Sequence, residues 1–167
     1  MVTDATSLFQ TVADAAARTG TPGDFFPVLE GAMNAALGHR LFTVLLYHED
    51  AGQTERFHTS NPDAYPVGGR KSPKPSAWTK RLFVEGKPYI GQDAGDIRTV
   101  FADHELILSL GCESVLNLPV VFAGRTLGTV NLLHEAGWYR QRDLPVGQVF
   151  AALVVPVLQR LVKTSRR

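Results

Sequence analysis

The chain has 167 residues, of which 44% are hydrophobic and 20% are charged, and its formal net charge is +1. This length and apolar content suit one domain with a sizeable core. The near-neutral charge excludes a whole-chain field that would hold nucleic acid or an anionic membrane. The only cysteine is Cys112, which excludes an internal disulfide and a cysteine-rich zinc site.

The first residues lack the basic region and continuous apolar segment of a secretory signal peptide. We also find no apolar run that approaches the roughly 20 residues needed to span a bilayer. A single cysteine fits a reducing compartment. We therefore expect a cytoplasmic protein that binds neither membranes nor nucleic acid. The short basic end, Lys163, Arg166 and Arg167, is expected to be solvated.

Two helices are predicted at the start of the chain. Apolar residues recur at helical spacing over residues 5–18, and Gly20 follows as a stop. Thr21 can cap a second helix, and Pro22 suits its first turn. The apolar stripe of this second helix comprises Phe25, Phe26, Leu29, Met33 and Leu37.

Two strands and a long loop are predicted next. Residues 41–48 are β-branched and aromatic and are apolar on both alternating faces, which is typical of a central strand covered on both sides. After a turn, a weaker strand is expected at 54–58. Prolines and glycines in residues 59–75 rule out a long regular element there. Loops of this length are often lids or binding loops, so this segment is a candidate lid.

The middle of the chain alternates helical and extended segments. A helix is expected to begin at Pro75 or Ser76 and to end at Gly86, and a short strand follows at 88–91. A further helical stretch over 96–110, with room for two pieces, leads to the next strand.

The clearest pattern is a β-hairpin between residues 113 and 134. We expect a loop of three residues, either 122–124 or 123–125, and this odd loop length decides which side chains share a face. One face then carries Asn117, Thr129 and Asn131, and the other carries Leu116, Leu118, Val120, Val130 and Leu132. A two-residue loop would separate the two asparagines.

A long helix is predicted to close the chain, at residues 141–162, with Pro156 as a candidate kink. Its valines and leucines lie on more than one side, and the leading helix, 5–18, is alanine-rich and weakly apolar. This pattern indicates a helical face left over for a symmetric partner. We therefore expect a homodimer formed through the terminal helices.

The order of these elements resembles the GAF family. The most specific resemblance lies in residues 111–120 and 124–132, where a small residue and an apolar strand precede a Pro-apolar pair, a Gly turn and an apolar-Gly-apolar strand. The resemblance covers nearly the whole chain, from about Thr21 to Leu161.

This resemblance implies an α+β fold with a central five- or six-stranded antiparallel sheet. Terminal helices would pack on one face, and a ligand cavity would lie on the other face beneath crossover helices. We therefore expect a single domain over residues 1–167, comprising a leading helix (1–20), a GAF core (21–161) and a basic tail (162–167).

The resemblance allows activities known in the family to be compared with the residues present. Cyclic-nucleotide-binding members carry an Asn-Lys-Xaa-Phe signature that this chain lacks. In the free methionine-R-sulfoxide reductases, cysteines precede the hairpin; here Leu106 stands roughly where the nucleophile would be, and Asn131 where an acidic residue would be. Bilin-binding members attach the pigment to a cysteine, but Cys112 follows a glycine at a strand start. We identify no catalytic residue, and a reductase-like enzyme is only a third alternative.

Metal and thiol chemistry receive little support from the sequence. Free cysteine usually packs as a small apolar side chain, which is our expectation for Cys112. Asp103, His104 and Glu105 are adjacent in sequence, so they face different ways on a helix and lack the spacing that places two ligands on one face. The other histidines considered are His48, His58 and His134. We predict neither a metal nor a cofactor.

Two hypotheses from different classes remain: a sensory module that binds a small organic or nucleotide-like molecule, and a ligand-free homodimeric interaction module. Two amides inside apolar strands need hydrogen-bond partners. They could bond each other or nearby backbone, or they could form the polar floor of a ligand cavity. The candidate ligand-binding residues are Asn117 and Asn131 on the floor, Trp78 and Phe101 as walls, Tyr65 on the lid loop, and His104 and Glu105 at the rim.

Overall fold

The computed structural model describes residues 4–18 and 21–165 of the chain. The helices are α1 (Ala5–Arg18), α2 (Pro22–Leu37), α3 (Ala77–Thr79), α4 (Ala94–Val100), α5 (His104–Ser109) and α6 (Leu144–Ser165). The strands are β1 (Leu41–His48), β2 (Gln53–Thr59), β3 (Gly68–Lys71), β4 (Tyr89–Gly91), β5 (Ser114–Phe122) and β6 (Arg125–His134). Two 3₁₀ turns, η1 (Glu49–Ala51) and η3 (Gln141–Asp143), and one π-helical turn, η2 (Lys80–Val84), complete the described elements. The predicted stop at Gly20 and the basic residues Arg166 and Arg167 lie outside the described residues.

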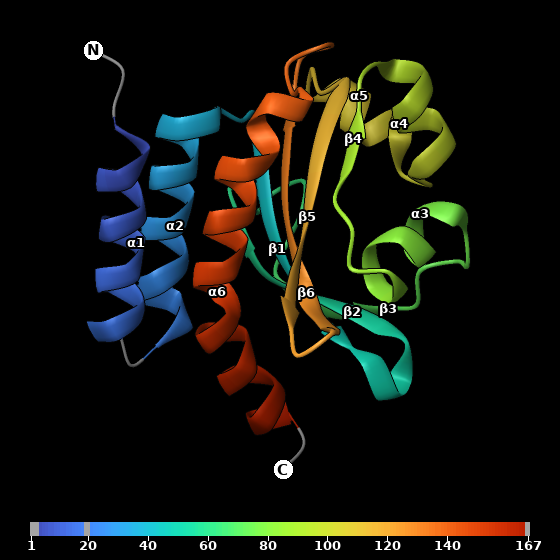
Figure 1. Cartoon of the computed structure of the whole chain (residues 1–167). Helices are drawn as coiled ribbons and strands as arrows, with labels where there is room; N and C mark the ends of the chain where they lie inside the picture. The colour runs from blue at the N-terminus through green and yellow to red at the C-terminus, as the bar shows by residue number, and fades with distance from the viewer. Residues whose placement is uncertain (1–3, 19–20, 166–167) are drawn as a thin grey trace.

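The strands form one six-stranded sheet in the order β3-β2-β1-β6-β5-β4, and all neighbouring strands are antiparallel. Helices α1, α2 and α6 lie on one side of this sheet, and α3, α4 and α5 lie on the other (Figure 1). The predicted α+β architecture, with terminal helices on one face and crossover helices on the other, is confirmed.

The main hydrophobic core lies between the sheet and the terminal helices. The residues predicted for the apolar face of the hairpin are all buried in it: Leu116, Leu118, Val120, Val130 and Leu132. Helix α1 packs on α2 and α6, where the Phe9 ring meets the Phe150 ring edge-on at 4.8 Å. Burying one such large apolar side chain contributes about 1.5–3 kcal/mol, so this layer supplies most of the driving force for folding.

A smaller core lies on the opposite face of the sheet, beneath the crossover helices. It joins strand residues to α4 and α5, and its buried members are Leu41, Tyr65, Ile97, Ile107, Cys112, Val115 and Leu133. Phe101 packs against this cluster from the end of α4. The sheet is therefore covered on both faces, as predicted from the apolar residues on both faces of β1.

The β5–β6 turn differs from the prediction. Phe122 pairs with Arg125, so the loop has two residues, Ala123 and Gly124, and not three. Both have positive φ, 51° and 76°, as a type I′ turn requires. A register shift between Val120 and Val121 then inserts one extra residue and places Asn117 directly opposite Asn131. The shared face of the asparagines is confirmed, but the bulge and not the loop length produces it.

The predicted absence of a long apolar run is wrong for α6. Residues Gln141–Ser165 contain an 18-residue window with mean hydropathy 1.5, long and apolar enough to cross a membrane by length and composition, and 33% of that window is buried. The core helix of a soluble protein passes the same test. Here α6 packs against the sheet through Phe150, Val154 and Leu158, and the polar residues that interrupt its apolar sequence are few.

The breaker-rich segment 59–75 contains one short strand that alternation does not reveal. All four residues of β3 are exposed at the edge of the sheet, and Gly68 and Gly69 have positive φ. The following helix begins where predicted, because the Ser76 side chain accepts from the Thr79 backbone N–H at 3.1 Å and caps it.

Candidate functional site

A row of polar side chains crosses the sheet on the face that the crossover helices cover. Cross-strand pairing places Thr59 beside Thr43, Thr43 beside Asn131, and Asn131 beside Asn117. Tyr89 on β4 continues the row beyond Asn117. Because paired residues on adjacent strands point to the same face, these five side chains form one line across β2, β1, β6, β5 and β4.

The two amides of this row bond each other. Asn117 Nδ2 donates to Asn131 Oδ1 at 2.7 Å, and Asn131 Nδ2 donates to the Thr43 and Thr129 hydroxyls at 3.2 and 3.1 Å. Asn117 is 2% exposed and Asn131 is 6% exposed. Direct bonding between the amides is therefore present, and it offsets the cost of burying them.

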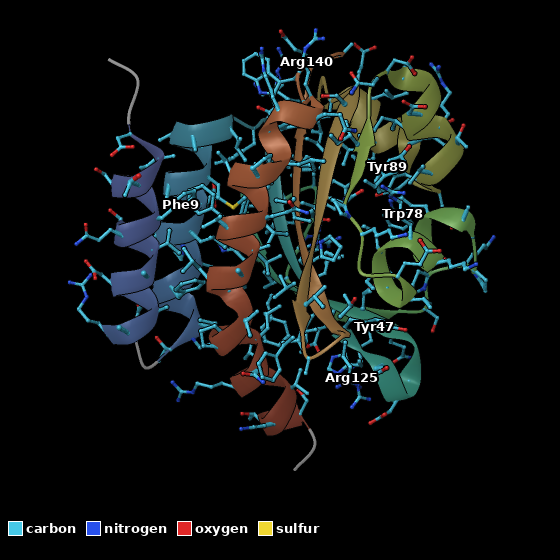
Figure 2. The ribbon with its side chains drawn as sticks, in the orientation of Figure 1. Phe9, Tyr47, Trp78, Tyr89, Arg125 and Arg140 are labelled. Carbon is cyan, nitrogen blue, oxygen red and sulfur yellow. The ribbon has the colours of Figure 1, made fainter. Side chains whose placement is uncertain are left out.

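The amide chain continues into the crossover layer through Trp78. The indole Nε1 donates to Asn117 Oδ1 at 3.0 Å, so the acceptor of this buried amide is occupied by the wall residue that the sequence proposes. Figure 2 shows Trp78 and Tyr89 on the side of the sheet away from α6. The predicted floor and one predicted wall are therefore in direct contact.

An aromatic row lies above the amides. The Trp78 ring meets Phe101 at 5.2 Å and 67°, and meets Phe83 at 6.4 Å and 86°, both edge-on geometries that aromatic pairs favour. Phe83 in turn stacks on Tyr47 at 4.6 Å. All four rings are partly exposed, whereas the amides beneath are buried. An apolar, partly accessible lining above a buried polar floor is the usual composition of a small-molecule site.

The remaining predicted site residues, Tyr65, His104 and Glu105, differ in burial and in hydrogen bonding. Tyr65 is buried, donates to Asp103 Oδ2 at 2.5 Å and lies 4.8 Å from the Arg56 guanidinium. Burial first, and then this hydrogen bond, raise the pKa of Tyr65 well above its usual range. His104 follows Asp103 in the chain, and its Nδ1 is buried without a hydrogen-bond partner among the described residues. Glu105 is exposed on α5.

The single thiol is buried, as predicted. Cys112 has no exposed surface, and burial raises its pKa to about 11, although Arg40 opposes this effect. A nucleophilic cysteine needs an accessible thiolate near neutral pH. The side chain therefore belongs to the smaller core and has the character of an apolar packing residue.

Five members of the two rows were missed in the sequence: Thr43, Thr59 and Tyr89 in the polar row, and Phe83 and Tyr47 in the aromatic row. Thr43 receives a hydrogen bond from Asn131, and its position as a polar residue within the apolar segment 41–48 is the signal that could have identified it. Phe83 reaches the aromatic row because the α3 helix continues into the π-helical turn η2, which shifts the facing of the residues that follow. No spacing rule applied to the sequence predicts that turn.

An open groove of about 480 Å³ lies elsewhere, between the β1–β2 connection, the β5–β6 turn and the end of α6. Tyr47, Phe122 and Lys163 contribute to its lining. Its polar groups include an ion pair in which Arg125 Nε donates to Glu49 Oε2 at 2.8 Å. The amides and their aromatic cover lie on the face of the sheet where the sequence predicts the ligand site, so we place the candidate site at the amide row and not in this groove.

No protein-family model matches the chain, and no curated protein matches its sequence. Solved structures do match it. The GAF domain of an Acinetobacter phosphoenolpyruvate-protein phosphotransferase is 11% identical, with a TM-score of 0.75 over 100% of both chains. The corresponding domain from Coxiella burnetii is 12% identical, with a TM-score of 0.75 over 98% of each chain.

A phycoerythrobilin-bound GAF domain from a cyanobacterial phytochrome is 13% identical, with a TM-score of 0.70 over 98% of each chain. Identities this low carry information about fold alone. The antiparallel sheet, the two helical layers and the coverage of these matches together identify the fold of this chain as that of the GAF domain.

Proposed function

We propose that this chain is a sensory or regulatory GAF domain that binds a small organic molecule between the sheet and the crossover helices. The observation that carries the proposal is the buried pair Asn117 and Asn131 beneath the partly exposed rings of Trp78 and Phe101. Polar groups fixed on central strands can orient a ligand, and the rings above them can cover it.

The outer residues of the proposed site are Tyr65, His104 and Glu105. His104 supports a role near the rim, because its buried Nδ1 is an unused polar atom among the described residues. Tyr65 would hold the start of α5 through its bond to Asp103. We assign Glu105 to the rim on its exposure and its position beside His104.

The structural neighbours support a sensory role. They include the phycoerythrobilin-bound domain described above and a GAF domain from a two-component sensor histidine kinase of Bacillus halodurans. We propose a cytoplasmic location on the sequence features alone.

A thermal-unfolding screen of small metabolites tests the proposal. We expect at least one compound to raise the melting temperature of the wild-type chain, because a ligand that binds only the folded state stabilises it. Asn117→Leu should remain folded and lose this response. The matched control is Gln141→Leu, which makes the same type of change at an exposed position and should keep it. A response that survives Asn117→Leu would place the ligand elsewhere.

A second candidate function is a ligand-free homodimeric interaction module. The observation that favours it is α6, which leaves Val149 42% exposed and whose apolar window is only 33% buried. The partner would be a second copy packed along the terminal helices. Light scattering tests this assembly, and a monomer at high protein concentration would contradict it.

A further inference from the structure

The indole of Trp78 lies against the amide row. Its Nε1–H occupies the Oδ1 of Asn117 at 3.0 Å, and Phe101 and Phe83 flank its ring edge-on. Asn117 uses its own Nδ2 to reach Asn131, so Oδ1 is the atom that it presents to the crossover layer. Asn117 Oδ1 therefore accepts a hydrogen bond from an aromatic ring N–H within the chain.

The segment that carries Trp78 is held mainly at its far end. Leu82 is fully buried, and its carbonyl accepts from the Thr126 hydroxyl at 3.1 Å. Phe83 stacks on Tyr47. Before these anchors, α3 has only three residues, and Ser76, Ala77 and Lys80 are exposed. A change confined to α3 and the Trp78 rotamer would separate the indole from Asn117 and leave the anchors in η2 in place.

We propose that Trp78 is an intramolecular occupant of the site, and that the ligand is a planar heteroaromatic molecule whose ring N–H replaces the indole on Asn117 Oδ1. This inference rests on the proposed function and names its ligand class and its regulation. The ligand selects the minor, open state, in which the indole no longer bonds to Asn117. The apparent affinity of the ligand is therefore reduced in proportion to the fraction of molecules in this open state.

Removal of the indole and its replacement by free indole test this directly. Trp78→Ala should unfold at a lower temperature than the wild type, and indole should restore part of the loss in a concentration-dependent manner. Benzofuran has nearly the same shape but an oxygen in place of the N–H, and it should bind about 3- to 10-fold more weakly, the range expected for one hydrogen bond. The same indole concentrations should leave the wild type unchanged, because its site is filled.

Two control variants sharpen the test. Trp138→Ala removes the other indole, which is 41% exposed and bonded to the Leu37 carbonyl, and indole should not restore its stability. In the double variant of Trp78→Ala and Asn117→Leu, indole and benzofuran should bind equally. Should Trp78→Ala fail to fold at 25 °C even with indole, Trp78→Leu is titrated in the same way with the same expectations.

Equal binding of indole and benzofuran to a folded Trp78→Ala would overturn the inference, as would no binding of either. Indole stabilisation of the wild type equal to that of the variant would also overturn it. The proposed function fails separately: if no metabolite stabilises the wild type while Trp78→Ala still discriminates indole from benzofuran, the recognition chemistry stands and the sensory role falls. If a metabolite stabilises the wild type but not Asn117→Leu, and indole does not bind Trp78→Ala, the sensory role stands and the inference about Trp78 falls.

Discussion

The coupling between Asn117 and Asn131 can be measured with a double-mutant cycle. Asn131 makes three side-chain hydrogen bonds, to Asn117, Thr43 and Thr129. The change Asn131→Leu removes all three and leaves Asn117 Nδ2 without its acceptor in a position that is 2% exposed. A leucine side chain recovers part of this cost, because it adds apolar surface to a buried site.

The magnitudes follow from these contacts. Each lost hydrogen bond costs about 1 kcal/mol, and a donor left unpaired in the interior costs about 1–3 kcal/mol. With an apolar compensation of about 0.8 kcal/mol for each of the two added carbons, we expect Asn131→Leu to cost about 2–4 kcal/mol. Asn117→Leu removes two hydrogen bonds and leaves the buried Asn131 Oδ1 without its donor, whereas the partly exposed Trp78 N–H can bond to water, so this change should cost about 1–3 kcal/mol. Both variants should therefore stay folded.

Replacing both amides removes the unpaired atoms that each single change leaves on its partner. The double variant should therefore be destabilised by about 1–2 kcal/mol less than the sum of the two single variants. Urea denaturation of the four proteins at one temperature gives these free energies of unfolding. Additive effects, with no coupling beyond error, would show that the two amides do not support each other and would refute this description of the site.

Three further predictions concern the turn, the thiol and a buried histidine. Ala123→Asn should stabilise the chain by about 0.5–1 kcal/mol, because Asn-Gly suits the positive φ of both turn residues; a lower midpoint in urea would contradict this. Cys112→Ala should cost about 1–2 kcal/mol and leave ligand binding unchanged, and rapid labelling of the folded wild type by a thiol reagent at neutral pH would contradict the packing role. Burial lowers the pKa of His39, with Glu30 opposing and with His134 and His58 adding to the shift, so the unfolded chain binds this proton more readily than the folded chain. Stability should therefore fall as pH drops below about 6.5, and His39→Gln should flatten this dependence in melting temperatures; equal slopes for the two proteins would contradict the assignment.

Much of the fold is predictable because local patterns and tertiary packing agree. The helix over residues 5–18 and the strand over residues 41–48 have the predicted bounds. The helix has one apolar stripe that packs on the core, and the strand is apolar on both faces and is covered on both. The β3 strand was not predicted, because its four exposed residues form an edge strand by pairing with β2 and carry no alternation of their own.

The site is predictable to a smaller extent. Two polar residues in apolar strands identify Asn117 and Asn131, since buried amides require partners. Their alignment, however, depends on the bulge at Val120 and Val121, which no turn rule contains. The bond from Trp78 to Asn117 joins residues 39 positions apart, and a distant contact of this kind leaves no trace in the spacing of either segment.

The indole N–H signals of the two tryptophans provide the most direct test of a ligand site on the amide row. Trp78 Nε1–H bonds to Asn117, whereas Trp138 Nε1–H bonds to the Leu37 carbonyl at 2.7 Å. The compound that most stabilises the wild type is titrated into ¹⁵N-labelled protein while both resonances are followed. We expect the Trp78 resonance to shift and saturate with the same midpoint as the thermal response, and the Trp138 resonance to stay in place. A saturating thermal response with an unchanged Trp78 resonance would contradict the assignment of the site.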